Sequence, residues 1–234
     1  EQEDRKDDTR QLFLIDSAGG EARRASHFAP GIEVFRWLPD GRRIAFAAWV
    51  WPELKGSQAQ AKRHKAFKER KESGYATSEA QYRYWDHNVP MGRVAHLHVL
   101  DVASGRVTDL FEGSGLELSR AEPDANTFDI APDGKRIAFV HDAAAEKRMD
   151  NCKQLSELNL RTRRTETLVH DKGWDLEHPR YSPDGQRIAF VASHQGKKHT
   201  MPAQLALLER GARWRVLSAD WDHAVHGPLR WADD

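Results

Sequence analysis

The chain has 234 residues, with 36 basic and 36 acidic side chains and a formal net charge of zero. This balance gives no global attraction to polyanions, so we expect neither nucleic acid nor a membrane surface as a partner. No apolar run approaches the about 18 residues of a membrane span. A single cysteine, Cys152, excludes an internal disulfide and leaves cytoplasm and periplasm open, with the cytoplasm preferred. The chain opens at Glu1 without an initiator methionine, so we expect a segment of a longer protein.

One ten-residue phrase occurs three times and marks an internal repeat. Each copy holds Pro-Asp-Gly, one variable residue and Arg-Ile-Ala-Phe. The copies span residues 37–46, 130–139 and 181–190, and Trp-Ala-Asp-Asp at 231–234 aligns with the start of a fourth. The aligned aspartates lie at 40, 133, 184 and 234, in steps of 93, 51 and 50 residues. A period of about 50 residues made of short strands indicates a β-propeller or a similar array.

Each repeat has the signals of a four-stranded blade. Proline presets φ for the turn, the aspartate side chain accepts backbone hydrogen bonds, and glycine accepts a positive φ. The Arg-Ile-Ala-Phe strand is apolar on both sides, as expected inside a blade. A third and a fourth strand are predicted after it in each copy, at 96–100 and 106–110, at 154–158 and 165–169, and at 204–208 and 214–217.

We therefore predict an all-β fold: a β-propeller segment of four-stranded blades with a helical insertion in one blade. Its parts are two strands that end a preceding blade (11–25), a blade at 32–112 with the insertion at 50–93, blades at 116–170 and 177–218, and the opening strand of a further blade at 227–234. Such an array leaves open strand edges, so we expect it to belong to a larger propeller. Pairing of two isolated copies into a homodimer is a second way to cover those edges.

The first step exceeds the 50-residue repeat by 43 residues, which fall between Phe46 and Val94. Residues 53–80 are rich in Ala, Gln, Lys and Glu, which predicts a helix. Seven Lys or Arg occur in 53–72 against three Glu, a pattern of either a solvated helix face or an interaction arm. Residues 82–90 gather aromatic rings, an Arg and an Asp, so they either anchor the insertion or stack on a ligand.

The chain lacks the motifs of several kinds of catalysis. No Gly-x-Ser-x-Gly occurs, because no two glycines lie four residues apart, and no catalytic residue is assigned. His96 and His98 share one strand face, but no Cys or His cluster has zinc spacing, so no metal is predicted. No glycine-rich phosphate loop occurs, and no cofactor is expected.

The repeats and the insertion together resemble a known family. The Pro-Asp-Gly repeats are similar to those of TolB-like propellers. Tyr-Arg-Tyr-Trp-Asp-His at 82–87, followed by the strand at 96–105, resembles the N-terminal propeller of bacterial prolyl oligopeptidase family serine peptidases, of the acylaminoacyl-peptidase and dipeptidyl-peptidase types. The resemblance implies a propeller of about seven or eight blades that caps a C-terminal α/β-hydrolase domain. That domain would hold the catalytic Ser, Asp and His, and the propeller would gate and help bind the peptide substrate.

The resemblance also implies where a peptide is contacted. We expect Arg83, Trp85 and Asp86 to approach the substrate, with Glu79 as a further candidate. In the dipeptidyl peptidase IV branch, two adjacent glutamates on a propeller insertion hold the substrate amine. The glutamates of this insertion are not adjacent, which leaves acylated or longer peptides as substrates. The alternative is a TolB-like propeller that docks proteins and has no enzymatic role. A protein-docking role gives no reason for an insertion of 43 residues within one blade.

Overall fold

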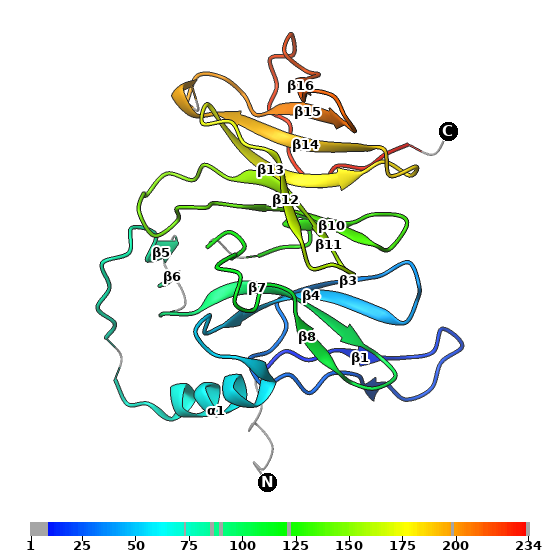
Figure 1. Ribbon diagram of the computed structural model, residues 1–234, viewed down its shortest axis with the longest axis vertical. Coiled ribbons are helices and arrows are strands. Elements are labelled where there is room, and N and C mark those ends of the chain that lie inside the picture. Colours follow the sequence, from blue (N-terminus) through cyan, green and yellow to red (C-terminus); the bar gives the residue numbers. More distant parts are fainter. Residues whose placement is uncertain are drawn as a thin grey trace.

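A computed structural model describes residues 9–72, 74–84, 87–88, 91–120, 123–197 and 199–232, and for 83, 84, 87 and 88 it describes the backbone alone. The antiparallel sheets are stacked in chain order along the long axis, from β1 and β2 at the N-terminal end to β13–β16 at the other end (Figure 1). The helix α1 (Gly56–Glu69) lies beside the first sheets. No described helix is both long and apolar enough to cross a membrane.

Within the described residues, three four-stranded sheets are the blades of a β-propeller segment, and each runs from strand to neighbouring strand in chain order. Blade 1 contains β3 (Val34–Trp37), β4 (Arg43–Val50), β7 (Val94–Asp101) and β8 (Val107–Asp109). Blade 2 contains β9 (Phe128–Ile130), β10 (Arg136–His141), β11 (Gln154–Asn159) and β12 (Thr165–Val169). Blade 3 contains β13 (Trp174–Tyr181), β14 (Arg187–His194), β15 (Gln204–Glu209) and β16 (Arg215–Val216). Before them, β1 (Phe13–Leu14) pairs with β2 (Arg23–Arg24).

The second strand of each blade is buried on both faces, and its large and small side chains take opposite sides. On one face, the Ile and Phe of each repeat pack against the preceding blade or sheet; these pairs are Ile44 and Phe46, Ile137 and Phe139, and Ile188 and Phe190. On the other face, small residues pack against the next blade. Ala45 and Ala47 of blade 1 meet the pair of blade 2, and Ala138 and Val140 of blade 2 meet the pair of blade 3. Because side chains alternate along a strand, one phrase repeated in register builds every interface between blades.

The Pro-Asp-Gly turns open these strands as predicted. In the first turn, Asp40 Oδ1 accepts the N–H groups of Arg42 and Arg43 at 2.9 and 3.0 Å. Burial by itself would raise the pKa of Asp40, but these hydrogen bonds and the Arg43 guanidinium hold it below its usual value. A Cβ placed on Gly134 would lie 3.5 Å from Pro39 Cδ, so the turns of neighbouring blades touch and line up.

Three boundaries differ from the sequence expectation. The helix covers 56–69 rather than 53–80, because the backbone becomes extended at Arg70. Strand β13 begins at Trp174, where it pairs with His194, rather than at 177. Residues 227–232 form no paired strand, and Trp231 Nε1 instead donates to the Arg180 carbonyl of β13 at 3.3 Å.

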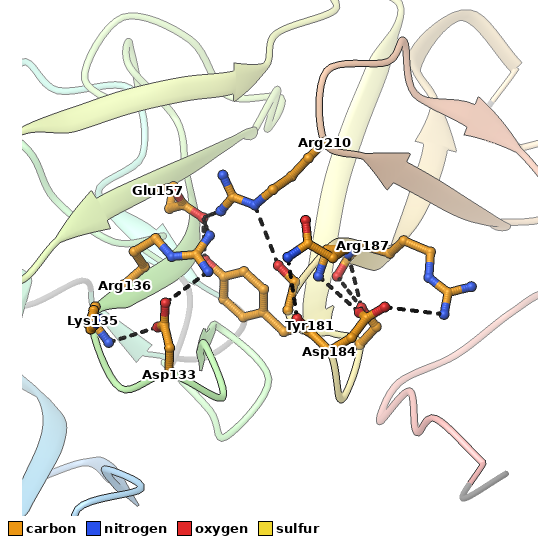
Figure 2. A network of polar contacts seen from close by, with 11 residues as sticks. Asp133, Lys135, Arg136, Glu157, Tyr181, Asp184, Arg187 and Arg210 are labelled. Carbon is orange, nitrogen blue, oxygen red and sulfur yellow. Dashed lines mark hydrogen bonds and ion pairs between the residues drawn. The ribbon is translucent and has the colours of Figure 1, made fainter.

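A carboxylate that is only 10% exposed, that of Glu157, joins blades 2 and 3 (Figure 2). Glu157 Oε1 accepts hydrogen bonds from Arg136 at 3.2 Å, Tyr181 Oη at 2.7 Å and Arg210 at 2.8 Å. Arg136 also pairs with Asp133 of the Pro-Asp-Gly turn at 3.1 Å. Burial raises the pKa of Tyr181, and the Glu157 carboxylate raises it further, so the hydroxyl remains a donor. We call the cluster of Glu157 with its three donors, Arg136, Tyr181 and Arg210, the Glu157 staple.

Candidate functional site

Helix α1 is fastened to the end of β4 by a buried glutamine. Gln60 Nε2 donates to the Trp51 carbonyl at 2.8 Å, and its Oε1 accepts the Trp51 N–H at 3.1 Å. Phe67 lies two turns further along the same helix face and packs edge-on against Trp51, with ring centroids 5.4 Å apart. Arg93, where the insertion rejoins blade 1, places its guanidinium carbon 4.6 Å from the Phe67 ring centroid. The two ends of the insertion therefore meet at one aromatic cluster.

Residues 74–82, which we name the strap, carry the chain from α1 towards blade 2 along one side of the stack (Figure 1). The Ala80 N–H donates to the Glu146 carbonyl, in the loop after β10, at 2.9 Å. Beside it, Glu79 Oε2 pairs with Arg120 Nη1 at 2.7 Å. Arg120 belongs to the segment that links β8 to β9, so the strap is held by blade 2 and by the connection between blades 1 and 2.

Arg120 is the central charged group under the strap. Its side chain is only 8% exposed, and its Nε donates to Glu117 Oε1 at 2.9 Å. Burial by itself would lower the pKa of Arg120, but the Glu117 and Glu79 carboxylates outweigh this effect and raise it, so the guanidinium stays charged. Burial raises the pKa of Glu117, and Arg120 offsets only part of that rise. The Arg120 guanidinium is thus shared by two carboxylates: Glu117 from the segment that links β8 to β9, and Glu79 from the strap.

A cavity of about 380 Å³ lies between the strap and the blades. Its volume falls in the range of small-molecule sites, about 300–1,000 Å³. Its polar lining consists of Glu79, Arg93, His96, Glu117, Arg120 and Glu146. A cavity lined by both guanidinium groups and carboxylates suits a polar ligand that has both hydrogen-bond donors and acceptors, as a peptide has.

The histidines of β7 are held by structure. Asp109 Oδ2 lies 2.8 Å from His96 Nδ1 and 3.6 Å from His98 Nε2, and His98 Nδ1 lies 3.1 Å from the His96 carbonyl. Burial lowers the pKa of His98 to about 4, so this ring is neutral near pH 7. No group of three or more His, Cys, Asp or Glu arranged to hold a metal ion is found in the described part of the chain.

The structure brings one of the four predicted contact residues, Glu79, to this cavity. Arg83 lies in β5 (Arg83–Tyr84), which pairs with β6 (His87–Asn88), and the structure gives its backbone alone. Trp85 and Asp86 lie outside the described residues, so their contact with a peptide stays a prediction. Sequence reasoning missed Arg120, because no motif marks it and its partner Glu79 lies 41 residues away.

Known proteins share this fold and part of this sequence, although no family model matches the chain. The chain is 25% identical over 217 residues to dipeptidyl-peptidase 5 of Porphyromonas gingivalis, which covers 87% of this chain and 30% of that protein. Acylaminoacyl peptidase of Pyrococcus horikoshii has a TM-score of 0.60 at 15% identity, over 92% of this chain and 29% of that one.

A TolB-type structure from Agrobacterium tumefaciens has a TM-score of 0.50 at 17% identity, over 89% of this chain and 56% of that one. The chain therefore spans less than a third of the length of the two peptidases that it resembles. The resemblance expected from the repeats is confirmed: the chain is a TolB-like β-propeller segment similar to part of the prolyl oligopeptidase family peptidases.

Proposed function

We propose that this chain is the non-catalytic propeller part of a serine peptidase, which gates and helps bind peptides for an α/β-hydrolase domain that follows it in a longer protein. The similarity to dipeptidyl-peptidase 5 along 87% of the chain supports a peptidase, and the propeller fold supports the gating role. Under this proposal the propeller contacts the hydrolase domain of the same longer protein, and that domain cleaves the peptide.

One observation carries the proposal: the strap contributes Glu79 to a polar cavity that is also lined by blade 1 and by the loop after β10 of blade 2. A propeller that only docks proteins needs no such lining, whereas a peptide-binding propeller uses an insertion to shape its pocket. The strap runs from Glu79 at the cavity directly into the β5–β6 hairpin, which begins at Arg83. Under this proposal, Arg83, Trp85 and Asp86 contact the peptide from the end of the strap.

The test is labelling of the longer, full-length protein with a fluorophosphonate, followed by mapping of the labelled peptide by mass spectrometry. We expect a label on a serine located after residue 234 and no label within the 234 residues. A folded protein that takes no label contradicts the proposal and leaves the alternative of a protein-docking propeller. We also expect the isolated 234-residue chain to hydrolyse no peptide ester.

We further propose that the isolated chain associates as a homodimer, because in the described part of the chain β1 and β2 form a sheet of two strands rather than four and leave open strand edges. Light scattering gives the mass in solution. A monomeric mass across the accessible concentration range contradicts this part of the proposal and leaves the peptidase assignment untouched.

A further inference from the structure

We propose that Arg120 is a binding site for a ligand carboxylate, and that the chain's own Glu79 occupies this site when the strap is closed. The ligand is a monocarboxylate, either a small acid or the terminal carboxylate of a peptide. The proposal concerns recognition alone and does not depend on the hydrolase assignment.

The guanidinium of Arg120 is held in place without the strap. Its Nε bond to Glu117 joins two residues of the same segment, three positions apart, and both side chains are largely buried, at 8% and 13% exposure. A guanidinium fixed along one edge keeps its remaining N–H groups aimed in a constant direction. Those groups reach Glu79 and border the cavity of about 380 Å³. Arg120 therefore remains oriented for a carboxylate after the strap departs.

Glu79 is the exchangeable partner of this pair. Its side chain is 44% exposed although Arg120 is buried, so water competes for the Glu79 carboxylate and lowers what the ion pair contributes to stability. The next residue joins the strap to blade 2 through a backbone hydrogen bond, from the Ala80 N–H to the Glu146 carbonyl. A carboxylate in solution can therefore replace Glu79 when this bond breaks and the strap moves away.

Closing the strap also leaves a polar group unsatisfied. Gln81 is 8% exposed, and its Nε2 has no hydrogen-bond partner among the described residues. A buried amide without a partner loses the hydrogen bonds that it makes with water in the open state. This loss opposes the Glu79 and Ala80 contacts, so the closed strap is held with a small net stability.

The charges around the cavity select a ligand with one negative charge. Three carboxylates, of Glu79, Glu117 and Glu146, and two guanidinium groups, of Arg93 and Arg120, line the cavity. A monocarboxylate that replaces Glu79 at Arg120 leaves this balance unchanged, whereas a second negative charge would face the Glu117 and Glu146 carboxylates. We therefore expect dicarboxylates to bind more weakly than monocarboxylates of the same size.

The experiment is titration calorimetry on the 234-residue chain with two matched pairs of probes. The small pair is N-acetylglycine and its amide, and the peptide pair is N-acetyl-tetraalanine with a free or an amidated C-terminus. We expect binding of a free carboxylate and none of the amides. Binding of both acids identifies a small-acid site, and binding of the peptide acid alone identifies a peptide terminus. Equal affinity for acid and amide, or no binding of any probe to wild type and variants, overturns the proposal.

The decisive variant is Glu79→Ala, which removes the competing carboxylate and leaves Arg120 and Glu117 in place. We expect tighter carboxylate binding by about two- to fivefold, the factor that corresponds to one partly exposed ion pair. Unchanged or weaker binding by this variant overturns the proposal. Glu209→Ala is the matched control, because it breaks an exposed Arg–Glu pair elsewhere, with Arg215 at 3.3 Å, and we expect no change.

Two further measurements separate binding at Arg120 from a general effect on the strap. Arg120→Gln abolishes carboxylate binding if folded, and Glu79→Ala keeps the proposal testable if that variant does not fold. In wild type, saturating N-acetyl-tetraalanine acid should speed hydrogen exchange at the Ala80 amide, since its bond to Glu146 breaks when the strap opens. If the ligand binds and the hydrogen-exchange rate of the Ala80 amide does not change, the ligand does not displace Glu79 and the proposal is overturned.

Discussion

The Glu157 staple makes a quantitative prediction about the interface between blades 2 and 3. Glu157→Gln keeps the side-chain volume and removes the negative charge at which Arg136, Tyr181 and Arg210 converge. Hydrogen bonds to a charged acceptor contribute about 1.5–3 kcal/mol, and neutral ones about 0.5–1.5 kcal/mol. The buried Tyr181 bond therefore loses about 1–1.5 kcal/mol.

The two arginines add less. Arg136 keeps its pair with Asp133, and Arg210 is 46% exposed, so water replaces much of what it loses. Exposed or partly exposed pairs contribute about 0.2–1 kcal/mol each. The staple as a whole should therefore lose about 2–3 kcal/mol of unfolding free energy.

Urea unfolding followed by tryptophan fluorescence measures this loss. With a urea m-value of about 2–3 kcal/mol/M, the midpoint should fall by about 1 M. Glu166→Gln is the matched control, since Glu166 is exposed and directly opposes Glu157 on the neighbouring strand β12. We expect a change within about 0.5 kcal/mol for the control. A Glu157→Gln midpoint equal to that of the control would refute the reasoning, because it would mean that the three donors gain nothing from the charge.

Two further predictions concern the packing between blades and the dependence on pH. Ala138→Leu places a large side chain on the face of β10 that meets Ile188 and Phe190, and should destabilise the chain by about 1–3 kcal/mol in the same assay; a neutral result contradicts the packing register. Burial lowers the pKa of His98 and His141 to about 4, whereas both titrate near 6.5 when unfolded. Their neutral forms therefore stabilise the fold fully above pH 6.5, and this stability falls as the pH drops towards 4, by up to about 3 kcal/mol for each ring. Urea unfolding at a series of pH values gives the unfolding free energy as a function of pH. His98→Gln should reduce its decrease between pH 6.5 and about 4, and an unchanged decrease contradicts the conclusion that His98 is buried as the neutral ring.

Much of the fold could be predicted because the repeated phrase carries local and long-range information together. The Pro-Asp-Gly turn fixes where a strand begins, and the alternation in Ile-Ala-Phe fixes which face meets which neighbour. The helix α1 lies between β4 and β7, in the stretch that the sequence marks because it interrupts an otherwise regular period. These features depend on residues close together in the chain.

The errors and omissions arise from contacts that the local sequence does not encode. Composition predicted a helix through 53–80, but at Arg70 the chain leaves the helix, and its guanidinium lies over the Phe67 ring, 3.8 Å from the centroid. The Arg70 guanidinium also donates to Met91 Sδ at 2.6 Å, 21 residues further along the chain. Helix propensity is a weak signal that tertiary contacts of this kind override. The partnership of Glu79 with Arg120 depends on how the strap crosses the blades, and no spacing within the sequence reports it.

The fixed order of large and small side chains gives the stack of blades a direction. At one end, Phe35 and Trp37 of β3 are 48% and 44% exposed, although the matching Phe128 of blade 2 is fully buried. At the other end, the small Ala189 and Val191 of β14 lie outside the last apolar interface and are only 9% and 2% exposed, so this end shows no exposed aromatic face of that kind. The two ends are therefore unlike, and copies that join one end to the other do so head to tail. Such contacts close into a two-copy ring only when each copy turns through half a circle, and otherwise they extend into an open filament. The curvature from blade to blade, rather than the chemistry of the ends, decides between a closed ring and a fibre.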